Sequence, residues 1–209
     1  AGLGMGVGSA ALATAISQFT SAILCMIHLM RTKEEYRLQL QKIGFDGLML
    51  RQIIQNGVPS GFQNSVIAIA NVFVQANINA FGKMAMAGCG SYSKIEGFAF
   101  LPVTCFTMAL TTFVSQNLGA KQYDRAKKGA WFGVLCSISI AELIGILIYT
   151  AAPILISAFN SDPEVVHYGV MQSRTIALFY CLLAFSHCIA AVLRGSGNAS
   201  VPMLVMLCV

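Results

Sequence analysis

Long apolar runs are the feature that most constrains what this chain can fold into. A membrane-spanning helix needs about 20 predominantly apolar residues, and the sequence contains several such runs separated by short polar segments. They predict spans at 3–30, 57–82, 92–118, 129–158 and 166–193, and a sixth that begins near residue 200. Only 10% of the 209 residues are charged and 56% are hydrophobic, which is too little charge to cover a water-soluble domain. The predicted fold class is all-α, a polytopic membrane helix bundle.

Positive charge alternates between successive connections of this predicted bundle. Ten basic residues fall on one side: Arg31, Lys33, Arg37, Lys42, Arg51, Lys121, Arg125, Lys127, Lys128 and Arg194. The other side has three: Lys83, Lys94 and Arg174. Because Lys and Arg are retained in cytoplasmic loops, we expect the richer side to face the cytoplasm. The basic residues flank helices and do not form one basic face, so we expect no nucleic-acid partner.

The predicted span 57–82 is unusually polar for a membrane helix. At 100° per residue, Asn64, Asn71 and Gln75 fall within about 20° of a common line along the helix. Unpaired amides are costly in hydrocarbon, so this stripe should face protein or water. Two interpretations stay open: the stripe lines a substrate cavity, or it holds the bundle together through interhelical hydrogen bonds of roughly 1 kcal/mol or less each.

Ionisable residues inside spans are rarer and more informative. Glu142 falls near the middle of span 129–158, where apolar surroundings disfavour a charged carboxyl. It is either a group that binds and releases a proton during transport or a permanently protonated structural residue. Glu96 is a second ion-coupling candidate, although pairing with Lys94 or Arg174 would make it a structural anchor. We interpret His187 as a core histidine, which is the commoner role of a lone helical His.

Several classes of protein are poorly supported by the sequence. It contains no Walker motif, HExxH, GxSxG or Asp-rich DDxxD-like cluster, and no Cys/His grouping has zinc-site spacing. An ATP-driven pump or a metal-dependent membrane enzyme would need such residues. We therefore expect no enzymatic activity, no bound metal and no cofactor other than a coupling ion.

Three motifs resemble, in order and spacing, those of MATE-type (multidrug and toxic compound extrusion) transporters. NGVPSG at 56–61 resembles the start of that family's seventh helix. TFVSQNLGAK at 112–121, followed by DRA at 124–126, resembles the end of its eighth helix and the next loop. VLRGSGN at 192–198, with Pro202 and Met203, resembles the turn from the tenth to the eleventh helix.

The resemblance implies part of a twelve-helix, two-lobe transporter. Residues 1–30 would be the last helix of the N-terminal lobe, 31–55 a cytoplasmic linker, and 56–209 the C-terminal lobe, truncated in its fifth helix. The implied activity is secondary antiport, in which organic, often cationic or amphipathic compounds leave in exchange for H⁺ or Na⁺. The implied partners are small organic substrates, the lipid bilayer and the missing N-terminal lobe, in a multi-pass protein of the bacterial plasma membrane.

One departure from the family pattern affects the expected coupling site. Several members carry a carboxylate about two turns into the seventh helix, whereas residues 65–70 here contain none. Coupling would then use Glu142 or a carboxylate of the missing lobe. The alternative function is a flippase of related fold for lipid-linked precursors or polysaccharides, which would need a more cationic cavity.

Overall fold

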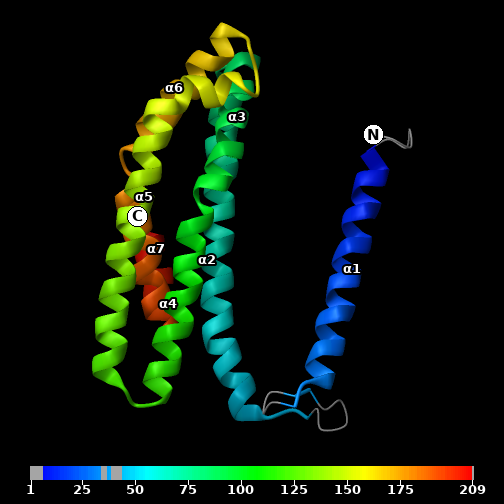
Figure 1. Ribbon diagram of the computed structural model, residues 1–209, viewed down its shortest axis with the longest axis vertical. Helices are drawn as coiled ribbons and strands as arrows, with labels where there is room; N and C mark the ends of the chain where they lie inside the picture. Colours follow the sequence, from blue (N-terminus) through cyan, green and yellow to red (C-terminus); the bar gives the residue numbers. More distant parts are fainter. Residues whose placement is uncertain (1–6, 34–36, 39–43, 209) are drawn as a thin grey trace. The chain divides into compact units, whose positions relative to one another are not determined.

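The computed structural model describes residues 7–33, 37–38 and 44–208, and every regular element among them is an α-helix (Figure 1). The chain divides after Leu50 into two units, Ala1–Leu50 and Arg51–Val209. The second unit holds the packed bundle. This confirms the predicted all-α membrane fold.

The first unit contains α1 (Val7–Arg31) and the start of α2 (Gly47–Ala80). The carboxylate of Asp46 caps α2, since its Oδ1 accepts hydrogen bonds from the backbone N–H groups of Leu48 (2.8 Å) and Met49 (3.2 Å). The predicted linker at 31–55 is therefore helical from Gly47 onward. Its residues 34–36 and 39–43 lie outside the described part of the chain.

Helix α2 starts ten residues before the predicted span 57–82, so the NGVPSG motif at 56–61 lies inside this helix and does not begin it. Pro59 lies inside α2. A proline cannot donate the usual backbone hydrogen bond to the residue four positions earlier. The carbonyl of Gln55 is therefore left without its usual helical partner at Pro59.

The helical segment that corresponds to the predicted span 92–118 is also longer than predicted. The chain turns between α2 and α3 at Gly82, whose φ of 97° suits a residue without a side chain. Helix α3 (Lys83–Ala99) starts directly after it, and α4 (Leu101–Gly119) follows a break at Phe100, with Pro102 in its first turn. The two helices together form one span of 37 residues.

The last part of the chain contains one long helix and one broken helix. Helix α5 (Tyr123–Ser157) begins six residues earlier than predicted. The predicted span 166–193 is divided into α6 (Pro163–Ala177) and α7 (Tyr180–Gly195), which meet at an angle of 55°. Helix α8 (Ser200–Cys208) confirms the predicted start near residue 200.

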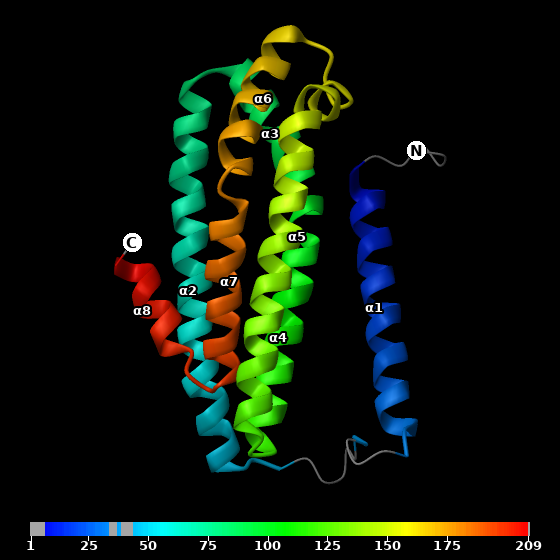
Figure 2. The ribbon, with the colours of Figure 1, turned by 60° about the vertical axis from the view of Figure 1, so that its left-hand side comes forward.

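The bundle is built around α5, which packs against α6 and α3 over one half of its length and against α4 and α7 over the other (Figure 2). Glycines allow the closest approaches. A Cβ on Gly145 would lie 2.7 Å from the Ala177 carbonyl oxygen, and a Cβ on Gly88 would lie 2.5 Å from that of Val165. Small residues let membrane helices pack by van der Waals contact where no hydrophobic effect drives them together.

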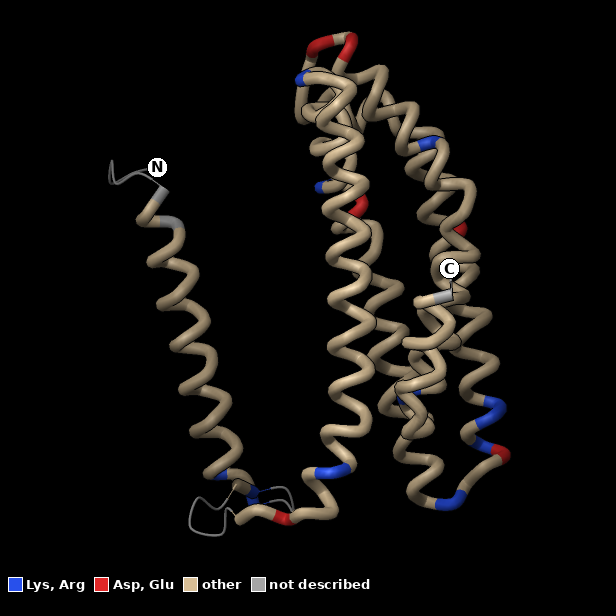
Figure 3. The backbone as a smooth tube through the Cα atoms, turned by 180° about the vertical axis from the view of Figure 1, so that it is seen from behind, with Lys and Arg blue, Asp and Glu red and all other residues tan. Residues whose placement is uncertain are grey.

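By length and hydropathy, three spans in the described part of the chain can cross a membrane: Ala11–Arg31, Lys83–Gly119 and Tyr123–Ser157. The bent pair α6 and α7 adds a fourth. The α4–α5 connection and its basic residues lie at one end of the bundle, and the acidic α5–α6 connection lies at the other (Figure 3). These two loops therefore lie at opposite ends of the bundle, as the alternation of basic residues predicts.

Candidate functional site

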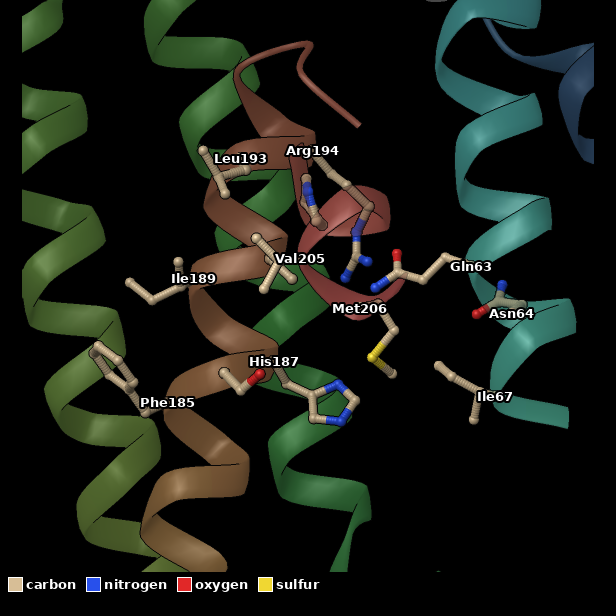
Figure 4. Close-up of a pocket in the computed structure, with 13 residues that line it drawn as sticks. Gln63, Asn64, Ile67, Phe185, His187, Ile189, Leu193, Arg194, Val205 and Met206 are labelled. Atoms are coloured by element: carbon tan, nitrogen blue, oxygen red, sulfur yellow. The ribbon is translucent and has the colours of Figure 1, made fainter. Parts of the chain in front are cut away.

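A pocket of about 380 Å³ lies between α2, α7 and α8 in the second unit (Figure 4). Its polar lining consists of Gln63, Asn64, Ser186, His187 and Arg194. Its apolar walls come from all three helices and include Ile67, Ile189, Pro202, Val205 and Met206. A concave apolar site with a few polar groups that converge on it is the usual form of a small-molecule site.

The two basic side chains of the pocket both come from α7. Arg194 lies seven positions after His187, so the two side chains leave the helix within about 20° of the same direction. The imidazole of His187 packs edge-to-face against the ring of Phe100, with centroids 5.1 Å apart. Arg194 is close enough to His187 for an electrostatic interaction between them. The guanidinium of Arg194 and the amide of Gln63 point toward one another across the pocket (Figure 4).

Only one of the three predicted amides reaches this pocket. Asn64 lines it, whereas Asn71 and Gln75 do not, although all three side chains are exposed on α2. The Gln75 amide instead donates to Oδ1 of Asn79 at 2.9 Å, one turn further along the same helix. The predicted stripe therefore contains Asn64, Asn71 and Gln75, but only Asn64 belongs to the pocket.

Glu96 lies in a cluster of hydroxyl groups. It is half-buried on α3 and interacts with the hydroxyl of Tyr92, one turn earlier on the same helix. Tyr92 is fully buried, and its hydroxyl lies 3.1 Å from that of Tyr180 on α7. The cluster joins α3 to α7 through polar contacts.

Neither expected basic partner of Glu96 pairs with it. The Nζ of Lys94 lies over the ring of Phe159, 5.5 Å from its centroid. Nε of Arg174 donates to the Tyr149 carbonyl at 3.3 Å, and its guanidinium lies 5.3 Å from the centroid of the Tyr149 ring. Cation–π contact thus holds both cations against aromatic side chains.

Glu142 lies on α5, next to the buried Ala141. Its Oε2 is buried and has no hydrogen-bond partner among the described residues. Both interpretations of Glu142, a group that exchanges a proton during transport and a permanently protonated structural residue, therefore stay open. A buried carboxyl oxygen without a partner is costly and is a place where a proton or a cation can bind.

Sequence reasoning missed Gln63, His187 and Arg194 as pocket residues. His187 was expected in the core and Arg194 in a cytoplasmic connection, but both line the pocket. The i, i+7 spacing of the two basic residues was the available signal. Within the described ranges, no group of three or more His, Cys, Asp or Glu residues could hold a metal ion.

Apolar helices of spanning length, a broken helix and an apolar pocket with a few polar groups between helices define an integral membrane protein of the polytopic helical class. The family model MatE matches residues 59–209. This match covers well over half of the chain, so the chain belongs to the MatE family.

Individual relatives agree with this assignment. The chain is 28% identical over 202 residues to "Probable multidrug resistance protein NorM" of Thermotoga maritima, covering 96% of this chain and 43% of that protein. It is 24% identical to "Probable multidrug resistance protein YoeA" of Bacillus subtilis, covering 96% and 44%. A solved structure described as "Crystal structure of MATE in complex with MaL6" superposes with a TM-score of 0.88 at 20% identity, covering 98% and 47%. The chain thus spans less than half the length of these proteins.

Proposed function

We propose that the intact protein is a secondary active antiporter that exports amphipathic organic compounds in exchange for H⁺ or Na⁺. We place it in the plasma membrane of a bacterium, since the two relatives named above are bacterial proteins described as probable multidrug resistance proteins. Its partners would be small organic substrates, the bilayer and the first lobe of the same protein. We expect no enzymatic activity and no cofactor besides the coupling ion.

The pocket between α2, α7 and α8 is the observation that carries this proposal. It offers amide, imidazole and guanidinium groups beside apolar walls. Such a mixture suits a substrate with an apolar body and a polar group, and it lies between helices, where bundle proteins usually bind ligands. Alternating access by two rocking lobes would expose such a site to each side of the membrane in turn.

Coupling needs a group that changes its occupancy of H⁺ or Na⁺ during the cycle. Glu142 is our first candidate because its Oε2 is buried and unpartnered in the described structure. Glu96 is the second, since it interacts with the buried Tyr92 hydroxyl. Either carboxyl would bind the ion in one state of the transporter and release it in another.

Dye export from cells tests the proposal. Cells that produce the intact protein should accumulate less rhodamine 6G, an amphipathic cation, or less carboxyfluorescein, an amphipathic anion, than cells with an empty vector. Ionophores that collapse both the proton and the sodium gradient should remove this difference. Export of either dye that persists without both gradients would show that the protein is not a secondary transporter.

A further inference from the structure

Arg194 lies in the last turn of α7, and this end of α7 stops before the end of the neighbouring α4. A Cβ on its neighbour Gly195 would lie 2.7 Å from the Thr111 carbonyl oxygen and 3.2 Å from Val114 Cβ, so this part of α7 packs directly on α4. Thr111 precedes the last residue of α4, Gly119, by eight positions. At about 1.5 Å per residue, Arg194 lies roughly 12 Å inside that end of the bundle.

The charge of Arg194 has no counter-ion in the described structure. No carboxylate is among the residues that line the pocket, and no ion pair involves Arg194 within the described ranges. A cationic side chain beside apolar walls is costly unless it reaches water, a cavity or an opposite charge. Arg194 faces the pocket (Figure 4).

The groups around the guanidinium are suited to an anion. Arginine presents its N–H donors in a planar fork that matches the two oxygens of a carboxylate or phosphate. The amide of Gln63 can donate from the opposite wall, and His187 can donate from about two turns, roughly 10 Å, away along α7. The apolar side chains of Ile67, Val205 and Met206 lie beside these donors.

We propose that this pocket binds the anionic group, a carboxylate or a phosphate, of an amphipathic molecule whose apolar part rests on α2 and α8. The inference rests on the proposed function and narrows its substrate class. A volume of about 380 Å³ accommodates the head of a small organic molecule. The same chemistry is found in soluble organic anions and in anionic phospholipid headgroups.

Equilibrium binding to the purified intact protein tests this inference without any ion gradient. The probes are carboxyfluorescein and rhodamine 6G, related ring systems of opposite charge, measured by fluorescence anisotropy in phosphatidylcholine nanodiscs. Arg194→Gln should weaken carboxyfluorescein binding by about tenfold or more, as loss of a charge-assisted hydrogen bond predicts. Rhodamine 6G binding should not weaken. Arg174→Gln, which removes the other arginine from the same bent pair of helices, is the matched control and should leave both affinities unchanged.

A second variant protects the test against misfolding of Arg194→Gln. Gln63→Glu places a carboxylate opposite the guanidinium, and it should block carboxyfluorescein binding while leaving the arginine in place. The inference is overturned if either folded variant binds carboxyfluorescein as tightly as the parent protein. It is equally overturned if the parent protein binds rhodamine 6G alone, since Arg194 would then be neutralised by a carboxylate from another segment.

Nanodiscs that contain phosphatidylglycerol identify the source of the anion. Weaker carboxyfluorescein binding in these nanodiscs, dependent on Arg194, assigns the pocket to a lipid headgroup, whereas unchanged binding assigns it to a soluble organic anion. Carboxyfluorescein binding through Arg194 without gradient-driven export would refute the antiporter proposal alone. Gradient-driven export with no role for Arg194 in carboxyfluorescein binding would refute this inference alone.

Discussion

At the residue scale, the environment of one carboxyl oxygen makes Glu142 the first candidate for ion coupling. Its Oε2 is buried and has no partner among the described residues, whereas buried polar side-chain atoms are in general hydrogen-bonded. The position of this residue in the middle of an apolar run was visible in the sequence. The missing partner was not, because the sequence does not show which groups of neighbouring helices lie within hydrogen-bond distance.

Glu142→Gln is the first prediction. Glutamine keeps the shape of a protonated glutamate but cannot release a proton, so export driven by a proton gradient should fall by about tenfold or more, equivalent to about 1.4 kcal/mol in the barrier. The measurement is dye efflux from energised vesicles over a range of imposed pH gradients. Glu164→Gln, an exposed residue in the first turn of α6, is the matched control.

Unchanged efflux with unchanged pH dependence in Glu142→Gln would make Glu142 a structural residue. The same experiment on Glu96→Gln would then decide whether the second candidate couples transport to protons.

The candidate site was only partly predictable at this scale. Helical periodicity correctly placed Asn64 on a polar stripe, and Asn64 does line the pocket. Periodicity does not tell which part of a stripe another helix covers. Helices α7 and α8 face the stripe only near Asn64, so Asn71 and Gln75 do not line the pocket.

At the scale of elements, the contact between α3 and α6 depends on Gly88. A Cβ there would lie 2.5 Å from the Val165 carbonyl oxygen and 2.9 Å from the Gly169 nitrogen, and backbone atoms cannot move aside as side chains do. Gly90 lies two residues away on the same helix, with open space around it.

We therefore expect Gly88→Ala to separate the two helices and to destabilise the protein by roughly 1–3 kcal/mol. Gly90→Ala should be neutral or slightly stabilising, since alanine favours a helix over glycine by about 1 kcal/mol. The thermal unfolding midpoints of the two purified variants in detergent give the comparison. Equal midpoints would mean that α3 and α6 are not held at the distance described.

Apolar runs predicted that these helices exist, but not where each begins or breaks. Helix α3 starts nine residues before its predicted start because the turn at Gly82 needs only two residues. The break between α6 and α7 contains neither proline nor glycine, so no local signal marks it. It coincides with the close approach of the Ala177 carbonyl to Gly145, which is a tertiary contact.

At the scale of the whole molecule, the alternation of basic residues predicts a sidedness that can be measured. The connections at 120–122 and 158–162 flank α5, whose 35 residues extend about 52 Å. Single cysteines at Gln122 and Ser161, in a variant lacking the seven native cysteines, should react with an impermeant maleimide from opposite sides of the membrane. Gln122 should react only from the cytoplasm.

Labelling of both positions from the same side would contradict the bundle topology. Labelling from opposite sides, but with Gln122 outside the cell, would contradict the orientation and leave the helix arrangement intact.

The breaks at Phe100 and at Leu178–Phe179 border one hydrophobic cluster, in which Phe100, Ala177 and Tyr180 pack together. On one side of this cluster α4 packs against α7, and on the other side α3 packs against α6. Helix α5 is continuous and contacts both pairs. The packed helices thus form two layers, one of α4 and α7 and one of α3 and α6, and α5 is continuous through both. If the layer of α4 and α7, which carries Arg194, tilted against the layer of α3 and α6, the backbone dihedral angles at these two breaks would absorb the movement. The packing inside each layer would be preserved.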